Sequence, residues 1–254
     1  MGEPNNALKV IATPTKLNQE DNFCDLKRLQ GGVYILNFTG NLQHMFSPEA
    51  IRSIDESLDQ VSRDRSACAL ITTNQGKFFS NGMDVNYLRK CDRQGALEYL
   101  LLFQKLLSKL LTFCLPTIAV IRGHAVGAGC IYAMAHDYRL MISDHPGYIF
   151  MNEVDLGLSL TPGIMAVLRS KLPVSTFQEA ILTGKRYDGR DAATARLVHA
   201  TCPTGRSLLQ EGIKKAMEYK ARNWKREVYH ALKMEMFQTT VRVLENGGVG
   251  FARM

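Results

Sequence analysis

The stretch FMNEVDLGLSLTPG, from Phe150 to Gly163, places the carboxylate of Glu153 among apolar neighbours. A carboxylate that loses its hydration in an apolar setting has a raised pKa, which suits a group that takes up and returns a proton. The segment is equally compatible with an acid at a strand edge that hydrogen-bonds to its neighbours. Glu153 is therefore a candidate general base whose role depends on the groups around it.

Two glycine-containing turns each follow an apolar run that is typical of a buried strand. The first is KFFSNGMDV, from Lys77 to Val85, and the second is RGHAVGAGCIYAMA, from Arg122 to Ala135, which passes directly into an apolar helix. N–H groups at a helix N-terminus stabilise an anion, and an N–H from another turn would complete an oxyanion hole. Either turn alone could serve only tight packing. The second turn lacks the Gly-Lys-Ser/Thr ending of a phosphate loop.

Alternating strand and helix patterns surround these turns. Short β-branched or aromatic runs predict strands, and apolar residues at helical spacing predict helices. The predicted strands cover 31–40, 67–74, 116–123, 138–143 and 147–153, and the predicted helices cover 47–63, 95–113 and 129–137 and begin again near 162 and 175. This alternation predicts an α/β fold with parallel strands.

The composition fits one large domain or one domain with a helical appendage. The chain has 254 residues, and 31 Lys and Arg against 24 Asp and Glu give a net charge of +7, which favours anionic partners. We predict a polar N-terminal tail over 1–30, a core over 31–204 and a helical region over 205–254. The basic stretch 214–226 is equally typical of a solvated helix face.

Other sequence features bear on the environment of the protein. We expect no membrane span, because no apolar stretch is long enough to cross a bilayer. The six cysteines are widely spaced without a CxxC pair, and no apolar leader stands at the N-terminus, so we expect buried free thiols in a reducing compartment. No cluster of His and Cys suggests a metal site.

Taken together, these segments resemble the crotonase (enoyl-CoA hydratase/isomerase) superfamily over about residues 31 to 202. KFFSNGMDV is similar to the family turn F-S-A-G-x-D, RGHAVGAGC to N-G-H-A-x-G-A-G, and EAILTGKRYDGRDAATARLV to the family helix pair that begins LTG and ends G-L-V. GKFFSNG, HDYRLM and NEVDLGLS most resemble the Δ3,Δ2-enoyl-CoA isomerases of plant peroxisomes. The resemblance implies a crotonase-like ββα superhelix (spiral) core with a C-terminal helical oligomerisation region, assembled as a homotrimer or a dimer of trimers.

The resemblance also implies an acyl-CoA substrate whose thioester oxygen accepts hydrogen bonds from the N–H groups of Met83 and Ala128. It implies that the first turn is shaped by its Asn-Gly pair and that a lysine lies near the CoA phosphates. No separate cofactor is implied, since coenzyme A is part of the substrate. The implied substrate-binding residues are Lys77, Asn81, Gly82, Asp84, Val85 and Gly127.

The family pattern distinguishes two reactions by the number of acids. Its hydratases carry two glutamates, at the positions of Ile131 and Glu153 in this sequence. Adding water is served by two carboxylates, whereas moving a double bond from C3 to C2 needs one base that carries a proton from C2 to C4. The resemblance therefore implies a Δ3,Δ2-enoyl-CoA isomerase of unsaturated fatty acid β-oxidation with Glu153 as its base.

Four further polar residues belong to the resembling segments. Asp155 would share a strand face with Glu153, because alternate residues of a strand point the same way, and we expect it to have a structural hydrogen-bonding role. For Asp84, His124 and Asp137 we expect buried, hydrogen-bonded positions without a chemical role.

Alternative functions remain open from the sequence. Another crotonase-type reaction, catalysed by a hydratase, hydrolase or lyase, would use the same oxyanion hole. A non-catalytic acyl-CoA-binding protein, or an RNA-binding protein using the face at 214–226, belongs to a different class, and we do not expect nucleic acid as the partner. The last residues, Ala252, Arg253 and Met254, resemble the Ser-Lys-Leu address, which predicts recognition by the peroxisomal import receptor and a peroxisomal location.

Overall fold

The computed structural model describes residues 23–40, 42–143, 147–248 and 250. These residues form a six-stranded sheet in the order β1-β2-β3-β5-β7-β9 and a three-stranded sheet in the order β4-β6-β8. The first comprises β1 (Cys24–Arg28), β2 (Val33–Phe38), β3 (Ala69–Asn74), β5 (Thr117–Ile121), β7 (Tyr138–Ile142) and β9 (Ala200–Cys202), and the second comprises β4 (Phe78–Ser80), β6 (His124–Val126) and β8 (Ile149–Phe150). Neighbouring strands are parallel except β1 and β2, which are antiparallel.

Helices connect the strands and complete the C-terminal part of the described chain. They are α1 (Pro48–Arg63), α2 (Val85–Lys90), α3 (Arg93–Leu111), α4 (Ala128–Met134), α5 (Pro162–Lys171), α6 (Val174–Thr183), α7 (Gly189–Thr194), α8 (Gly205–Ala221), α9 (Arg226–Met236) and α10 (Gln238–Asn246). The start of α1 follows the sequence closely, because the Ser47 side chain accepts from Ala50 N–H and Pro48 occupies the first turn.

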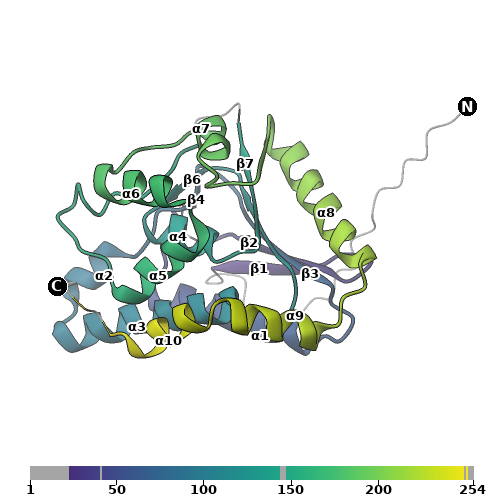
Figure 1. Cartoon of the computed structure of the whole chain (residues 1–254), viewed down its shortest axis with the longest axis horizontal. Coiled ribbons are helices and arrows are strands. Elements are labelled where there is room, and N and C mark those ends of the chain that lie inside the picture. The colour runs from purple at the N-terminus through teal and green to yellow at the C-terminus, as the bar shows by residue number, and fades with distance from the viewer. Residues whose placement is uncertain (1–22, 41, 144–146, 249, 251–254) are drawn as a thin grey trace, which may run out of the picture.

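Two apolar clusters pack against opposite faces of the six-stranded sheet. Val33 and Ile35 of β2 belong to the cluster under α8, whereas Tyr34 and Leu36 belong to the cluster that also includes α1, α3 and α4. This division follows from the alternation of side chains along a strand. Figure 1 shows α8 on one side of the sheet, with α1, α3, α9 and α10 together on the other.

The small sheet brings the two glycine turns to one place. β4 and β6 are parallel, with Phe78 paired with His124 and Ser80 paired with Ala125. Gly82 and Gly127 follow these strands by two residues and by one residue, respectively. Both turns therefore leave the same edge of the sheet, and β8 brings the segment around Glu153 to that edge through its pairing with β6.

The predicted α/β class with mainly parallel strands is confirmed, and two local predictions are wrong. Residues 24–28 are not a tail but form β1, which pairs with β2 and buries the Cys24 side chain. The strand predicted over 147–153 is limited to Ile149–Phe150, and Glu153 lies in a turn. Residues 1–22 and 252–254 lie outside the described residues.

Candidate active site

The first turn is held by a clamp of two aromatic residues around Met83. Phe46 N–H donates to Gly82 O at 2.8 Å, Tyr99 O–H donates to Phe46 O, and Asp84 N–H donates to Tyr99 Oη at 2.9 Å. These bonds engage the backbone on both sides of Met83. Sequence reasoning missed the clamp, although a tyrosine on the apolar face of a helix signals a hydroxyl that needs a buried partner.

The second turn leads from β6 into α4. Gly127 has φ 51° and ψ −117°, a backbone conformation that a residue with a side chain rarely adopts. This turn makes Ala128 the first residue of α4, where a backbone N–H has no partner within the helix. The N–H of Ala128 is therefore available to a ligand.

The two turns lie in direct contact. A Cβ placed on Gly82 would lie 3.0 Å from Val126 O and 3.2 Å from Ala128 N, so only a glycine fits at this distance. Within the described residues, neither Met83 N–H nor Ala128 N–H donates a hydrogen bond. Two unused backbone donors thus stand on adjoining turns, as an oxyanion hole requires.

Glu153 lies beside the second turn. A Cβ on Gly127 would be 3.0 Å from Glu153 Oε1, so the carboxylate lies against the residue that precedes Ala128. Its Oε2 is buried and has no hydrogen-bond partner among the described residues. Burial raises the pKa of Glu153 above its ordinary value of 4.5, while the backbone N–H groups of residues 152 and 153 oppose this effect. The site therefore contains an acid that is poised to exchange a proton.

The position of the second acid of the hydratase pattern is apolar in this chain. Ile131, on α4, is only 1% exposed and belongs to the main apolar cluster. Cys130, the residue before it, is fully buried, and burial together with the charge of nearby Glu153 raises the pKa of its thiol. Of these three groups, only Glu153 has the chemistry of a proton carrier near neutral pH.

Other predicted binding residues shape the first turn rather than face the second one. Asn81 donates from Nδ2 to Gln43 Oε1 at 2.6 Å, and Asp84 caps α2 by accepting from the N–H groups of residues 86 and 87. Val85 begins α2 and is exposed. Lys77 precedes β4, at the opposite end of that strand from Gly82, with Nζ over the Phe78 ring. The structure therefore does not bring Lys77 together with the two turns.

The remaining polar candidates differ in their surroundings. Asp155 is exposed, and its Oδ2 would lie 2.9 Å from a Cβ on Gly184, so it points to the end of α6. The prediction that Asp155 shares a strand face with Glu153 is wrong, because a turn replaces the strand there. His124 is half-buried and its Nδ1 accepts from Tyr148 N–H. Asp137, also half-buried, accepts from Thr117, Tyr229 and Lys233.

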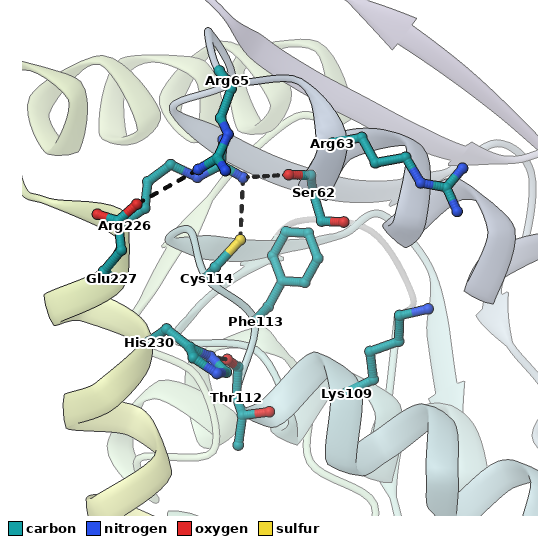
Figure 2. Close-up of a pocket in the computed structure, with 10 residues that line it drawn as sticks. All are labelled: Ser62, Arg63, Arg65, Lys109, Thr112, Phe113, Cys114, Arg226, Glu227 and His230. Atoms are coloured by element: carbon teal, nitrogen blue, oxygen red, sulfur yellow. Dashed lines mark hydrogen bonds and ion pairs between the residues drawn. The ribbon is translucent and has the colours of Figure 1, made fainter.

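A cavity of about 600 Å³ lies elsewhere, between the C-terminal ends of α1 and α3 and the start of α9. Figure 2 shows the Arg226 guanidinium between Ser62 and Cys114, with Arg65 beside Glu227. Arg226 donates to Ser62 O at 2.8 Å, to Asp64 O at 2.7 Å and to Cys114 Sγ at 3.2 Å. These bonds attach α9 to the ends of α1 and α3. The cavity therefore lies at a contact between helices, and none of the predicted site residues lines it.

Neither a metal centre nor a membrane helix is found where the structure describes the chain. No group of three or more His, Cys, Asp or Glu side chains in the described ranges could hold a metal ion. Among the same residues, no helix is both long enough and apolar enough to cross a bilayer.

Comparisons with known proteins agree with the fold. The family model described as enoyl-CoA hydratase/isomerase matches residues 30–248. The chain is 32% identical to enoyl-CoA delta isomerase 2, peroxisomal, and 30% identical to enoyl-CoA delta isomerase 3, both from Arabidopsis thaliana, and each match covers 87% of this chain and 95% of the relative. The human mitochondrial delta3-delta2-enoyl-CoA isomerase has the same fold, with a TM-score of 0.79 at 20% identity over 87% of this chain and 86% of that one. The chain belongs to the enoyl-CoA hydratase/isomerase family.

Proposed function

We propose that this protein is a Δ3,Δ2-enoyl-CoA isomerase that moves the double bond of a 3-enoyl-CoA to the 2-trans position. The observation that carries the proposal is the placement of Glu153, a half-buried acid with one buried, unpaired oxygen, against the glycine turn that presents Ala128 N–H. The names of the Arabidopsis relatives support the same reaction.

In the proposed mechanism the thioester oxygen accepts hydrogen bonds from Met83 N–H and Ala128 N–H. Glu153 removes a proton from C2, and the electron pair of that C–H bond moves toward the carbonyl to give a dienolate. The two N–H donors stabilise the negative oxygen, a contribution of roughly 3 to 4 kcal/mol for one such donor in known enzymes. Protonated Glu153 then delivers the proton to C4, which leaves the double bond between C2 and C3.

The apolar residue at the second acid position of the hydratase pattern favours isomerisation over hydration. Hydration requires that water be positioned and deprotonated while C2 receives a proton, and paired acids serve that task. Ile131 offers no oxygen or nitrogen to a water molecule. One carboxylate that shuttles the same proton needs no co-reactant, and coenzyme A enters as part of the substrate, so the proposed reaction uses no separate cofactor.

The test is the rate at which the purified protein converts trans-3-hexenoyl-CoA to its 2-enoyl isomer, measured beside the hydration of crotonyl-CoA. Glu153→Gln keeps the shape of the side chain but removes the base, so we expect the isomerisation rate to fall by about 10² to 10⁴. Asp155→Asn is the matched control, since it removes an acid from the same turn that points toward Gly184.

Two outcomes would overturn this assignment. Equal isomerisation by the wild type and Glu153→Gln would remove Glu153 from the mechanism. Hydration without isomerisation would show that the protein catalyses another reaction of the family. If neither reaction occurs, hydrolysis and carbon–carbon cleavage can be assayed with other acyl-CoA substrates. A protein that only binds acyl-CoA would bind the substrate saturably and show no turnover. An RNA-binding protein would show an affinity for RNA that falls steeply with salt and is unchanged in Glu153→Gln.

We also propose that the protein acts in peroxisomes as a homotrimer or a dimer of trimers. The word peroxisomal in the name of one Arabidopsis relative and Ala252-Arg253-Met254 at the end of this sequence support the location. A fluorescent protein fused ahead of this sequence, with and without the final tripeptide, tests the address, and loss of peroxisomal signal on deletion is the expected result. Light scattering during gel filtration tests the assembly.

A further inference from the structure

A second cavity, of about 490 Å³, lies where the end of α5 meets the connection between α7 and β9. The residues that line it include Arg139, Ser170, Lys171, Arg196 and His199, and no Asp or Glu is among them. None of these residues belongs to the turns or the acid of the candidate active site. An opening lined by so many basic groups and by no acid favours an anionic occupant.

Arg139 is the most buried of these basic groups, with 3% of its surface exposed. Its Nε donates to Leu197 O at 2.7 Å, and its Nη1 donates to His136 O at 3.0 Å. No acceptor for Nη2 is found in the described ranges. The guanidinium is therefore fixed by neutral carbonyl groups, keeps its full charge uncompensated by a direct ion pair, and retains a donor for a ligand.

Lys171 is a second cation in the lining of this cavity. No carboxylate in the described part of the chain pairs with it. Its Nζ donates to His136 O at 3.3 Å and lies 4.5 Å from the centre of the Phe237 ring. Burial is the main cause that lowers the pKa of Lys171 to about 7, with further contributions from the charges of Arg139 and Lys233. The charge of Asp137 raises that pKa, but Asp137 forms an ion pair of 2.9 Å with Lys233.

Arg196 and His199, both exposed, add donors to the lining. Arg196 has φ 59°, a left-handed conformation, and occupies the position where the family pattern G-L-V has its glycine. This chain therefore places a charged side chain where the pattern has none. His199 Nδ1 accepts from Arg139 N–H at 3.1 Å, so the neutral ring carries its proton on Nε2.

The larger cavity in Figure 2 differs, because three of its four Lys and Arg side chains, Arg63, Arg65 and Lys109, form ion pairs with acids. Arg65 pairs with Glu227 at 3.5 Å, and Lys109 pairs with Asp55 at 2.8 Å and Asp59 at 2.7 Å. Arg226 is bound to two carbonyl oxygens. Positive charge alone thus does not distinguish the two cavities. The smaller cavity differs in that, among the described residues, none of its Lys and Arg side chains in the lining, Arg139 and Lys171 included, forms an ion pair with an acid.

We propose that this smaller cavity binds a phosphoryl group, carried by inorganic phosphate or by a small phosphomonoester. A phosphate dianion accepts hydrogen bonds from several directions and matches a guanidinium group beside an ammonium group. Arg139 and Lys171 supply these groups, and Arg196 adds a second guanidinium group to the lining. The site is separate from the acyl-CoA reaction and does not depend on it.

The experiment is calorimetric titration of the full-length protein with inorganic phosphate, glycerol 3-phosphate and, as a monoanion control, acetate. We expect saturable binding of a phosphoryl ligand and none of acetate. Loss of one charged hydrogen-bonding partner typically weakens binding by about tenfold or more. We therefore expect Lys171→Gln to lower the affinity for phosphate by about this factor. Arg196→Gly removes a second cation at a backbone position that favours glycine, so the protein should fold, and its phosphate affinity should also fall.

Two controls make the result specific. Lys214→Gln removes a positive charge from α8 away from this cavity and should leave the affinity unchanged, whereas Lys171→Arg should retain most of it. Tighter binding of glycerol 3-phosphate than of inorganic phosphate would identify a phosphomonoester as the ligand class, and equal affinities would identify free phosphate. Absence of saturable binding, or the same affinity in the wild type, Lys171→Gln and Arg196→Gly, would overturn the proposal.

Discussion

Glu153 illustrates how one residue can be poised for chemistry at some cost to the fold. Its Oε2 is buried without a partner among the described residues, and burial raises the pKa of the carboxyl group. A raised pKa brings the pKa of the carboxyl group closer to neutral pH. The carboxylate is then a stronger base than that of an exposed glutamate and takes up a proton from carbon more readily. Under the proposed function, this oxygen is the atom that would take the C2 proton of the substrate.

The first prediction concerns the pH dependence of isomerisation. If Glu153 must be ionised to take the C2 proton, kcat/KM should fall as the pH drops through the pKa of this carboxyl group in the free enzyme. Because burial raises that pKa, the midpoint of the acidic limb should lie above 4.5. A pH profile with trans-3-hexenoyl-CoA measures it. A midpoint at or below 4.5, or an unchanged limb in the residual activity of Glu153→Gln, would contradict the assignment.

The second prediction concerns stability at the same residue. Between the ordinary and the raised pKa, the folded state holds more protons than the unfolded state, so the free energy of unfolding decreases as the pH rises. Glu153→Gln removes this penalty. We expect the variant to unfold at higher urea concentration than the wild type at about pH 8, with the difference shrinking toward about pH 4. Asp155→Asn is the control, and a Glu153→Gln variant that is less stable at every pH would argue against the buried charge.

At the scale of elements, the site depends on two turns whose backbone geometry only glycine permits. Gly127 has a positive φ, and a Cβ there would meet Glu153 Oε1 at 3.0 Å and Asn152 Oδ1 at 3.3 Å. Gly82 faces Val126 O and Ala128 N in the same way from the other turn. The parallel pairing of β4 with β6 fixes the separation of the two turns, so the donors are preorganised by the small sheet.

The third prediction tests this geometry with Gly127→Ala. The strained backbone should cost about 1 to 3 kcal/mol of unfolding free energy, and the methyl group should displace Glu153 and reduce isomerisation. Gly76→Ala is a matched control, since Gly76 also has a positive φ of 79° but has open space where a Cβ would lie. We expect comparable destabilisation in both variants and a loss of activity in Gly127→Ala alone. Equal activity in the two variants would show that the contact with Glu153 is unimportant.

The alternation of strands and helices and the two glycine turns could be predicted from local sequence, whereas contacts between distant segments and the ends of strands could not. Gly82, Gly127 and Glu153 stand in recognisable turns after apolar runs, so both the alternation of elements and the site could be approached from the sequence. The clamp by Phe46 and Tyr99 escaped prediction because it joins segments that are distant in sequence. The strand before Glu153 was predicted too long because an apolar run specifies burial but not where pairing ends. β1 was not predicted because it is short and three of its five residues, Asp25, Lys27 and Arg28, are charged.

At the scale of the whole molecule, hydrogen bonds to the largely buried carboxylate of Asp137 connect the C-terminal helices to the rest of the fold. Asp137, just before β7, accepts from Thr117 N–H at 2.9 Å, Tyr229 O–H at 3.0 Å and Lys233 Nζ at 3.0 Å. Thr117 begins β5, whereas Tyr229 and Lys233 lie on α9. α10 in turn packs against α3 and α5, as the lower part of Figure 1 shows. The expected hydrogen-bonded role of Asp137 is therefore realised as a link between distant elements.

The fourth prediction tests this link with Lys233→Met. The Lys233 side chain is 5% exposed and that of Asp137 is 17% exposed, so removing the cation leaves a largely buried carboxylate without its ion-pair partner. Loss of one partner of a buried pair costs about 3 to 5 kcal/mol, whereas Lys215→Met, which breaks a more exposed pair with Glu218, should cost about 1 kcal/mol or less. Urea unfolding measures both variants. Because the penalty comes from the uncompensated charge, the double variant Asp137→Asn/Lys233→Met should recover part of the loss. A double variant less stable than Lys233→Met would instead mean that hydrogen bonds from Thr117 and Tyr229 to the carboxylate hold the helices in place.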